Sequence, residues 1–168
     1  MASPLDLDPR WRALQERGGV IDIGFDHPSE WPHSERGDAP FVKEGEDQLT
    51  SELCRAGDLR YLRAVLSLPI RGSEEALGVA LWIEVPHTVF YAYLDHLDGG
   101  TLPANELGIL ANDITPLADM GSPVTLAFET DGARPQAGID GLADISLDHL
   151  LDLYEASGTL ARSDLKPS

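Results

Sequence analysis

Two stretches of alternating apolar and polar residues occupy the middle of the chain. Between residues 62 and 70 every second residue is apolar, and residues 77–85 repeat the pattern after a short polar turn at 71–75. Alternation with a period of two is typical of a strand with one buried face. Because so short a connection forbids a crossover, the two stretches predict an antiparallel hairpin over 59–85. Trp82 falls on the opposite face of its strand, which predicts that both faces of the hairpin are covered.

The apolar spacing changes to that of a helix at three places. Residues 9–17 follow Asp8, a residue type that caps helix starts. Residues 87–97 come directly after the hairpin, and a last helix begins after Ser146 and ends at Gly158. The side chains expected to be buried on these helices recur every three or four positions: Trp11, Leu14, Val89, Phe90, Tyr93, Leu94, Leu97, Leu147, Leu150, Leu151 and Tyr154.

Residues 25–58 form the least regular part of the chain, with three prolines, many charges and scattered apolar residues. A connection of this length without regular structure is uncommon inside a compact domain and is often functional or mobile. We expect an irregular segment with short helical turns at 28–35 and 47–55. Apolar side chains such as Trp31 should pin it to the body of the protein.

Two further strands complete the expected sheet. Residues 124–130 place alternate apolar side chains on one face, and residues 134–139 are the fourth strand. Because proline has no N–H for a ladder, Pro135 favours an edge position for that strand. Strands in hairpin order with helices between and after them predict the α+β class, with an antiparallel sheet of about four strands and helices packed on it. We expect a single domain over 1–168 with a flexible tail at 163–168.

The chain is strongly acidic, with 29 acidic and 12 basic residues and a formal net charge of −17. The imbalance is greater in residues 94–168, which carry 13 acidic and 3 basic residues. A surface of this sign repels nucleic-acid phosphates and anionic lipids, so neither nucleic acid nor a membrane is expected as a partner. The acidity either reflects solubility and adaptation of the host proteome or offers a docking surface to a basic protein.

Cys54 is the only cysteine of the chain, which excludes an internal disulfide and a thiolate metal cluster. A lone cysteine is either a nucleophile beside a histidine or, more commonly, a small buried apolar residue. The first ten residues lack the apolar stretch of a secretory signal, and no window approaches the ~18 apolar residues of a membrane span. The sequence therefore predicts a cytoplasmic protein.

Several short motifs occur in a characteristic order. A strand with a central tryptophan at 81–85 runs into the helical residues Phe90 and Tyr93, and further motifs lie at 61–70, 108–112 and 132–135. This order resembles a bacterial family catalogued as domain of unknown function twenty-one ninety-nine, over about residues 45–157. Two family features have no counterpart: an N-terminal Cys-x-x-Cys segment, and a His-Pro-Leu element replaced here by residues 142–144. The resemblance implies a fold type and a bacterial origin, without a zinc site or a reaction.

Two histidines are the candidate metal ligands. His27 and His33 lie near Asp26 and Glu35, and imidazole with carboxylate suits a divalent ion. Their spacing matches no standard zinc site, so exposed loop residues are the simpler interpretation. The chain contains no phosphate-binding glycine loop, dinucleotide fingerprint or nucleophile elbow. We therefore assign no cofactor and no catalytic residue.

Four residues are the candidate binding residues: Trp31, Trp82, Asn112 and Arg134. Arg134 is one of three basic residues after position 94, so its guanidinium either holds a structural carboxylate, such as Asp113 or Asp131, or accepts an anionic ligand group. Trp82 either packs in the core and covers the sheet or forms a platform for a ligand.

Three hypotheses about function follow from these patterns. The first, which the complete set of core-forming patterns favours, is a non-catalytic binding or protein-interaction module, with a basic protein partner or self-association through an edge strand. The second is an enzyme, hydrolase-type or metal-dependent, that uses residues 25–58 as a lid. The third is an immunity-type inhibitor of a basic toxin.

Overall fold

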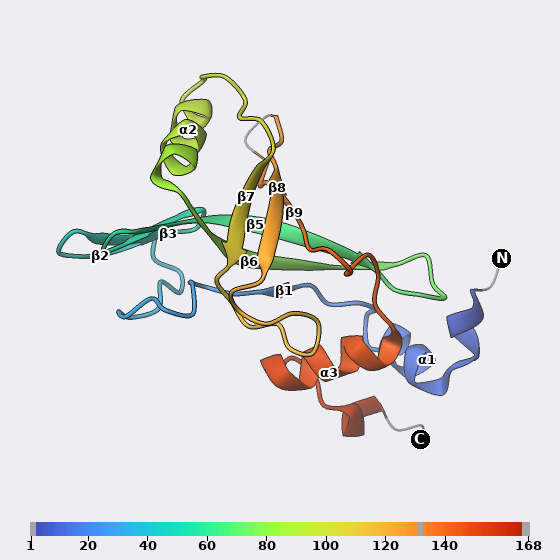
Figure 1. Ribbon diagram of the computed structural model, residues 1–168. Coiled ribbons are helices and arrows are strands. Elements are labelled where there is room, and N and C mark those ends of the chain that lie inside the picture. Colours follow the sequence, from blue (N-terminus) through green and yellow to red (C-terminus); the bar gives the residue numbers. More distant parts are fainter. Residues whose placement is uncertain (1–2, 131–132, 166–168) are drawn as a thin grey trace.

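The computed structural model describes residues 3–130 and 133–165 (Figure 1). Within these residues the helices are α1 (Pro9–Glu16), α2 (His87–Leu97) and α3 (Leu147–Ser157), with short 3-10 helices η1 (Pro4–Leu7) and η2 (Arg162–Leu165). The strands are β1 (Ile23–Gly24), β2 (Phe41–Glu44), β3 (Asp47–Thr50), β4 (Leu53–Ala56), β5 (Leu59–Pro69), β6 (Ala76–Val85), β7 (Glu106–Leu110), β8 (Pro123–Ala127) and β9 (Gln136–Gly138). This mixed content confirms the α+β class.

The hairpin of β5 and β6 is the centre of the fold and confirms the hairpin predicted over 59–85. The two strands pair antiparallel over ten residue pairs, from Arg60 opposite Val85 to Pro69 opposite Ala76. Each strand also has two successive neighbours on its outer edge. β4 and then β9 lie beside β5, whereas β1 and then β7 lie beside β6. The long β5–β6 hairpin therefore connects β4 and β9 with β1 and β7 in one sheet.

Five strands close a barrel in the order β5-β6-β7-β8-β9, with β9 returning to β5. The β5–β9 pair is parallel, and the other pairs of the barrel are antiparallel. The sheet of the described chain has nine strands, so the expectation of about four antiparallel strands is wrong. The omitted strands β2, β3, β4 and β7 are four or five residues long, which is too short for an alternation to be recognised.

Strand β9 lies inside the sheet, because it pairs with β8 on one side and with β5 on the other. The edge position predicted from Pro135 is therefore wrong. Pro135 is buried immediately before β9, and its carbonyl accepts a hydrogen bond from the Val65 N–H at 2.9 Å. Only the missing N–H of proline is incompatible with a ladder, and here the carbonyl alone is used.

Strand β7 approaches β6 very closely at Gly108. A Cβ at this position would lie 2.4 Å from Cγ2 of Ile83 and 2.9 Å from the carbonyl oxygen of Glu84. Any side chain would push β7 away from β6, so the barrel closes here because the residue is glycine.

The main hydrophobic core fills the barrel and extends beneath the helices. It contains the alternating apolar residues of β5 and β6 and the predicted stripes of α1, α2 and α3, and both predictions are confirmed. Leu97 is the exception, because it is the last residue of α2 and 40% exposed. α1 and α3 lie together at one end of the hairpin, and α2 lies at the other (Figure 1). The hydroxyl of Tyr154 on α3 bonds to the backbone N–H and carbonyl of Ile21.

The opposite face of the hairpin carries a second core. Its buried members are Trp31, Leu49, Cys54, Tyr61, Trp82 and Ala111. Coverage of both hairpin faces, which the position of Trp82 predicts, is confirmed.

Three short strands cover part of this second core. β2, β3 and β4 follow one another as antiparallel neighbours and attach to β5. The helical turn expected at 47–55 is therefore wrong, and the irregular segment is confined to 25–40. Gly45 and Gly57 occupy the two-residue turns before β3 and β5 with φ of 63° and 58°, a conformation that glycine adopts without strain.

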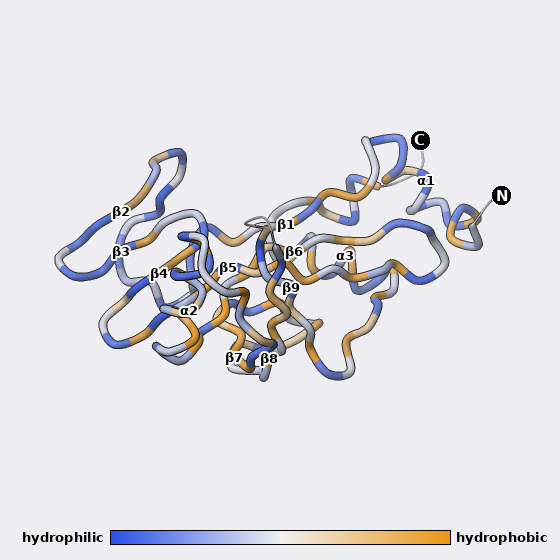
Figure 2. Tube along the Cα trace, turned by 90° about the horizontal axis from the view of Figure 1, so that it is seen from above, coloured by the Kyte–Doolittle hydropathy of each residue, from blue (hydrophilic) through white to orange (hydrophobic). Residues whose placement is uncertain are grey.

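Hydrophobic residues gather where β5 and β6 cross the centre of the molecule, while the projecting β2–β3 hairpin is largely hydrophilic (Figure 2). Residues 163–165 of the expected tail belong to η2, and Leu165 is buried in the main core. Residues 166–168 lie outside the described residues. Among the described helices, none has both the length and the apolar character needed to cross a membrane.

Candidate functional site

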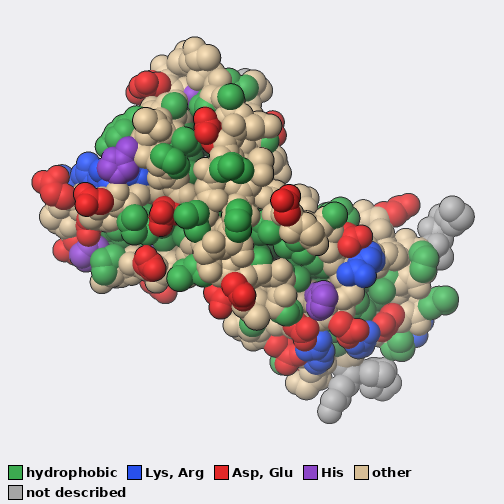
Figure 3. Space-filling view, in the orientation of Figure 1, with side chains coloured by type: hydrophobic (Ala, Val, Ile, Leu, Met, Phe, Trp, Pro, Cys, Tyr) green, Lys and Arg blue, Asp and Glu red, His purple; other side chains and the backbone are tan. Residues whose placement is uncertain are grey.

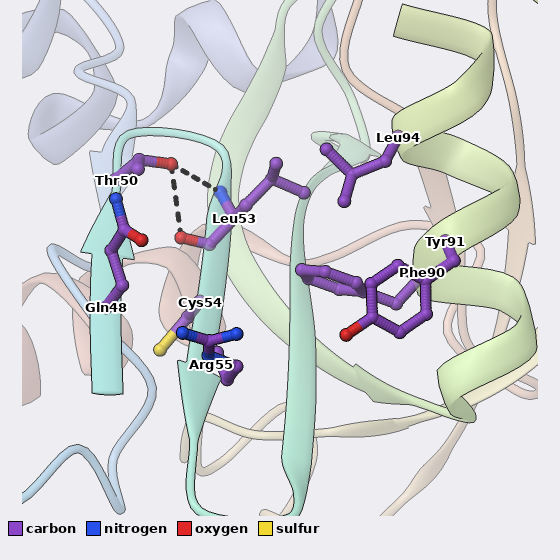
Figure 4. A pocket seen from close by; sticks show the side chains of 8 residues that line it. All are labelled: Gln48, Thr50, Leu53, Cys54, Arg55, Phe90, Tyr91 and Leu94. Atoms are coloured by element: carbon purple, nitrogen blue, oxygen red, sulfur yellow. Dashed lines mark hydrogen bonds between the residues drawn. The ribbon is translucent and has the colours of Figure 1, made fainter. Parts of the chain in front are cut away.

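A groove lies between helix α2 and the neighbouring face of β3 and β4 (Figure 4). Its volume is about 270 Å³. We call it the α2 groove and define it by the eight residues that line it: Gln48, Thr50, Leu53, Cys54, Arg55, Phe90, Tyr91 and Leu94.

Local structure decides which side chains face this groove. Strand alternation turns Leu53 and Arg55 of β4 toward α2, whereas the sulfur of Cys54 between them points away from the helix (Figure 4). On α2, Phe90 and Leu94 are four residues apart and therefore share one face. The result is a groove with apolar side chains on both walls.

The two ends of the α2 groove differ in polarity. Figure 4 shows Leu53 and Leu94 facing each other at one end, while Arg55 and the hydroxyl of Tyr91 lie at the other. Arg55 donates from Nε to the carbonyl of Glu46 at 2.7 Å, and its nearest carboxylate oxygen, on the 98% exposed Glu46 side chain, is 3.8 Å away. The polar end therefore carries a cation with a weak ion pair.

A second guanidinium stands beside this end. Arg60 on β5 is the direct cross-strand partner of Arg55 on β4, so the two side chains share a face of the sheet. Arg60 is buried, with its Cζ 6.0 Å from the centre of the Phe90 ring. Its Nη1 donates to the carbonyls of Gly57 and Leu59, while its buried Nε has no partner among the described residues.

The pKa of the Tyr91 hydroxyl is affected by both arginines. Interaction with the Arg60 guanidinium lowers the pKa of the exposed Tyr91 hydroxyl, and Arg55 contributes in the same direction. A nearby positive charge has this effect because it stabilises the phenolate. The ring of His87 packs edge-on against Tyr91 at 6.4 Å. Figure 3 shows basic and histidine side chains close together beside α2, on a surface with many carboxylates.

Cys54 is a buried apolar residue. Its side chain is 1% exposed, and burial raises the pKa of its thiol to about 12. Because the thiolate is the reactive form, the neutral thiol is a poor nucleophile near neutral pH. The structure thus agrees with the buried interpretation of this cysteine.

The structure brings two of the predicted binding residues together, and we call their contact the Trp82–Asn112 junction. Asn112 is 1% exposed, and its Oδ1 accepts the Trp82 backbone N–H at 2.7 Å. Its Nδ2 donates to the carbonyl of His27 at 3.1 Å. The Trp82 indole donates to the carbonyl of Phe25 at 2.9 Å. Both side chains therefore attach the irregular 25–40 segment to β6.

Trp31 lies in the second core at 5% exposure, and its indole donates to the carbonyl of Ser34 at 2.9 Å. It pins the irregular segment, as its position in the sequence suggested.

Arg134 forms an ion pair, but with a different carboxylate from those expected. Its Nε and Nη2 donate to the two carboxylate oxygens of Glu52 at 2.6 and 2.9 Å. Asp113 instead accepts from the Thr115 N–H and hydroxyl, and Asp131 lies outside the described residues. Glu52 sits in the turn between β3 and β4, so the ion pair ties this turn to the segment before β9.

Arg63 is a further guanidinium on the outer face of β5. Its Cζ lies 5.6 Å from the centre of the Trp82 ring, and Nη1 donates to the carbonyl of Ser51 at 3.3 Å. The Nε atoms of Arg63 and Arg36 lack partners among the described residues. Neither side chain lines the α2 groove.

The two candidate metal ligands do not converge. His33 pairs through Nε2 with Asp47 at 2.8 Å, while Nδ1 of His27 lies 2.7 Å from the carbonyl of Pro28. Asp26 accepts the backbone N–H of Arg36 at 2.8 Å. Within the described residues, no three His, Cys, Asp or Glu side chains are grouped so that they could hold a metal ion.

Sequence reasoning did not find Arg55, Arg60 or Tyr91. The signal that was available is local: Gly57 and Asp58 between two short polar-apolar runs indicate a tight hairpin, and its two-residue turn sets Arg55 opposite Arg60. The position of Tyr91 over this pair depends on tertiary packing of α2, which no local pattern predicts.

Comparison with known proteins gives one match. A family model described as "Uncharacterized protein conserved in bacteria (DUF2199)" matches residues 15–148. The matched range begins and ends earlier than the range over which the motifs resemble that family. No curated protein and no solved structure matches the chain.

Proposed function

The chain belongs to the uncharacterised bacterial family DUF2199, and from this premise we propose that it is a non-catalytic binding module. The proposed site is the α2 groove, and the proposed occupant is a small molecule with an apolar chain. The observation that carries the proposal is a groove of about 270 Å³ with apolar side chains on both of its walls. Small-molecule sites are typically concave, mostly apolar and provided with a few polar groups.

The state of the other candidate side chains supports binding rather than catalysis. The thiol of Cys54 is neutral and buried beside the groove. Asn112 and Trp82 hold backbone groups, and Arg134 holds Glu52. A catalytic group needs its reactive atom free for the substrate, whereas these atoms are engaged within the fold.

The test is a titration of isotopically labelled protein with straight-chain alcohols, followed through backbone amide resonances. Octanol should shift the resonances of groove residues on β3, β4 and α2 and leave those of α3 unchanged. Each additional methylene that enters the groove should tighten binding about fourfold, because burying one methylene contributes ~0.8 kcal/mol.

A blocking variant makes the site assignment specific. Gln48→Trp places an indole inside the groove, since Gln48 lines it and shares the face of its cross-strand partner Arg55. Lys43→Trp is the matched control, because Lys43 is the exposed partner of Gln48 one strand further from α2. Gln48→Trp should abolish the octanol shifts, and Lys43→Trp should retain them. Equal binding by both variants, or no shifts in the original protein, would refute the proposal.

A further inference from the structure

The polar end of the α2 groove is lined by Arg55, and its cross-strand partner Arg60 lies next to it without being a lining residue. Arg55 and Arg60 are cross-strand partners, and like charges in this arrangement destabilise a sheet. The chain has 29 acidic residues, yet among those that the structure describes only the exposed Glu46 side chain comes within 4 Å of the Arg55 guanidinium. No ion pair joins Arg60 to a carboxylate of the described residues.

Arg60 is an incompletely satisfied buried cation. Arg60 is 9% exposed as a whole residue. Its Nε has no hydrogen-bond partner in the described chain. Burying a charge is costly unless it is paired and hydrogen-bonded, and arginine is almost never fully buried without a partner. The two carbonyls that bind Nη1 provide hydrogen bonds but no countercharge.

Tyr91 adds a neutral donor at the same place. Both guanidiniums lower the pKa of its hydroxyl, and the residue is 46% exposed. The two guanidiniums and the phenol are donors, and among the described residues the exposed Glu46 carboxylate, 3.8 Å from Arg55, is the one carboxylate paired with them. From this polar end the groove runs between Leu53 and Leu94 to its apolar end (Figure 4).

We infer that the occupant of the α2 groove is an apolar chain that ends in an anionic group, bound by Arg55 and Arg60 with the hydroxyl of Tyr91. This inference rests on the proposed function and adds the chemistry of the ligand's head group. Guanidinium groups recognise carboxylate and phosphate alike through paired hydrogen bonds. Placing an anion between Arg55 and Arg60 removes the repulsion of the cross-strand pair and supplies the countercharge that Arg60 lacks.

The experiment compares three ligands with the same eight-carbon chain: octanoate, octyl phosphate and octanol. Calorimetric titration of the full chain should give dissociation constants for both anions at least tenfold below that of octanol, since charge-assisted hydrogen bonds are about twice as strong as neutral ones. The tighter of the two anions identifies the head group. Binding of the anions should weaken as salt is added, and binding of octanol should not.

Arg55→Gln is the decisive variant, because the Arg55 side chain is one-third exposed and tolerates substitution better than the buried Arg60. It should weaken octanoate binding about tenfold and leave octanol binding unchanged. Arg17→Gln removes one positive charge from the exposed end of α1 and is the matched control for net charge. Tyr91→Phe should give a smaller loss for octanoate alone.

The outcomes separate the two proposals. Equal affinities for octanol and octanoate, or identical effects of Arg55→Gln and Arg17→Gln, would overturn the inference about the anion and leave the apolar groove as the site. Absence of binding by all three ligands would overturn the proposed function itself.

Discussion

The Trp82–Asn112 junction and the α2 groove lie on opposite faces of the β5–β6 hairpin, and each combines an aromatic residue with a nearby buried polar group. They differ in whether those polar groups are satisfied. Asn112 and the Trp82 indole bond to backbone groups of other segments, whereas the Nε of Arg60 has no partner in the described chain. Buried polar groups are nearly always paired, and each exception asks for an explanation. The comparison separates a junction whose polar groups are engaged within the fold from the groove that we propose as a ligand site.

The largest expected effect concerns Cys54, which belongs to the second core and borders the α2 groove. Burial raises the pKa of its thiol from 9.0 to about 12. At pH 8 the thiolate fraction should be about a thousandfold lower than in the unfolded chain, and reaction with a disulfide reagent should slow in proportion. The reaction rate of the native and urea-unfolded protein measures this difference.

The same shift predicts how Cys54 affects stability. Because the thiol ionises at lower pH in the unfolded chain, its deprotonation favours unfolding as the pH rises above 9.0 toward 12. Below pH 9.0 the Cys54 thiol itself should contribute no pH dependence to the free energy of unfolding. Native and unfolded reaction rates within tenfold of each other would mean that the thiol is accessible from the groove.

The next effect tests the junction. Asn112→Ala removes the acceptor of the Trp82 N–H and the donor to the His27 carbonyl. Leaving these buried groups unpaired should lower the free energy of unfolding by about 3 kcal/mol, as measured by urea denaturation. Asn105→Ala, at an exposed asparagine, is the matched control and should change stability little. Similar losses in both variants would contradict a structural role for Asn112.

A smaller effect is expected at the ion pair of Arg134. Glu52→Gln leaves the guanidinium without its bidentate partner. Because both side chains are about one-third exposed, solvent screening should limit the loss of unfolding free energy to about 1 kcal/mol. Glu46→Gln, which affects the longer 3.8 Å contact with Arg55, should have no measurable effect. An equal loss in the two variants would show that Arg134 needs no carboxylate.

The smallest effect has the opposite sign and tests the groove. Arg55→Gln removes one of two opposed positive charges, so the ligand-free protein should become more stable by up to about 0.5 kcal/mol. Denaturation at low salt measures the gain, which should shrink as salt screens the repulsion. A clear loss of stability would assign Arg55 to the fold and remove the contrast with Asn112.

Much of the fold could be predicted, because period and length are local properties. The β5–β6 hairpin and the three helices follow from spacing, with Ser146 and Gly158 bounding α3 as expected. The barrel could not be predicted. Its closing contact joins residues 136–137 to residues 65–66 in parallel, and such pairing leaves no trace in either segment. The sequence predicts a helical turn over 47–55, where the structure has β3 and β4, and predicts no strand at β2, because four residues are too few to show a period.

The sites show the same limit. Residue type suggested Trp82 and Asn112 as binding residues. The structure brings them together, but their side chains form hydrogen bonds with backbone groups of the protein. The arginines of the groove gain their character from the register of β4 on β5 and from the placement of α2 above them. Composition did not indicate these arginines, because a net charge of −17 suggests a site built from carboxylates.

The close approach of β7 to β6 at Gly108 allows other chains with the same barrel to be recognised. Contact with Ile83 and Glu84 leaves no volume for a Cβ, and four residues later Asn112 binds the Trp82 N–H of the same strand β6. A random library at position 108 selected for folding should return glycine alone. A glycine and an asparagine at this separation, downstream of a tryptophan-bearing strand, therefore form a sequence filter that would identify distant homologues sharing the closed barrel.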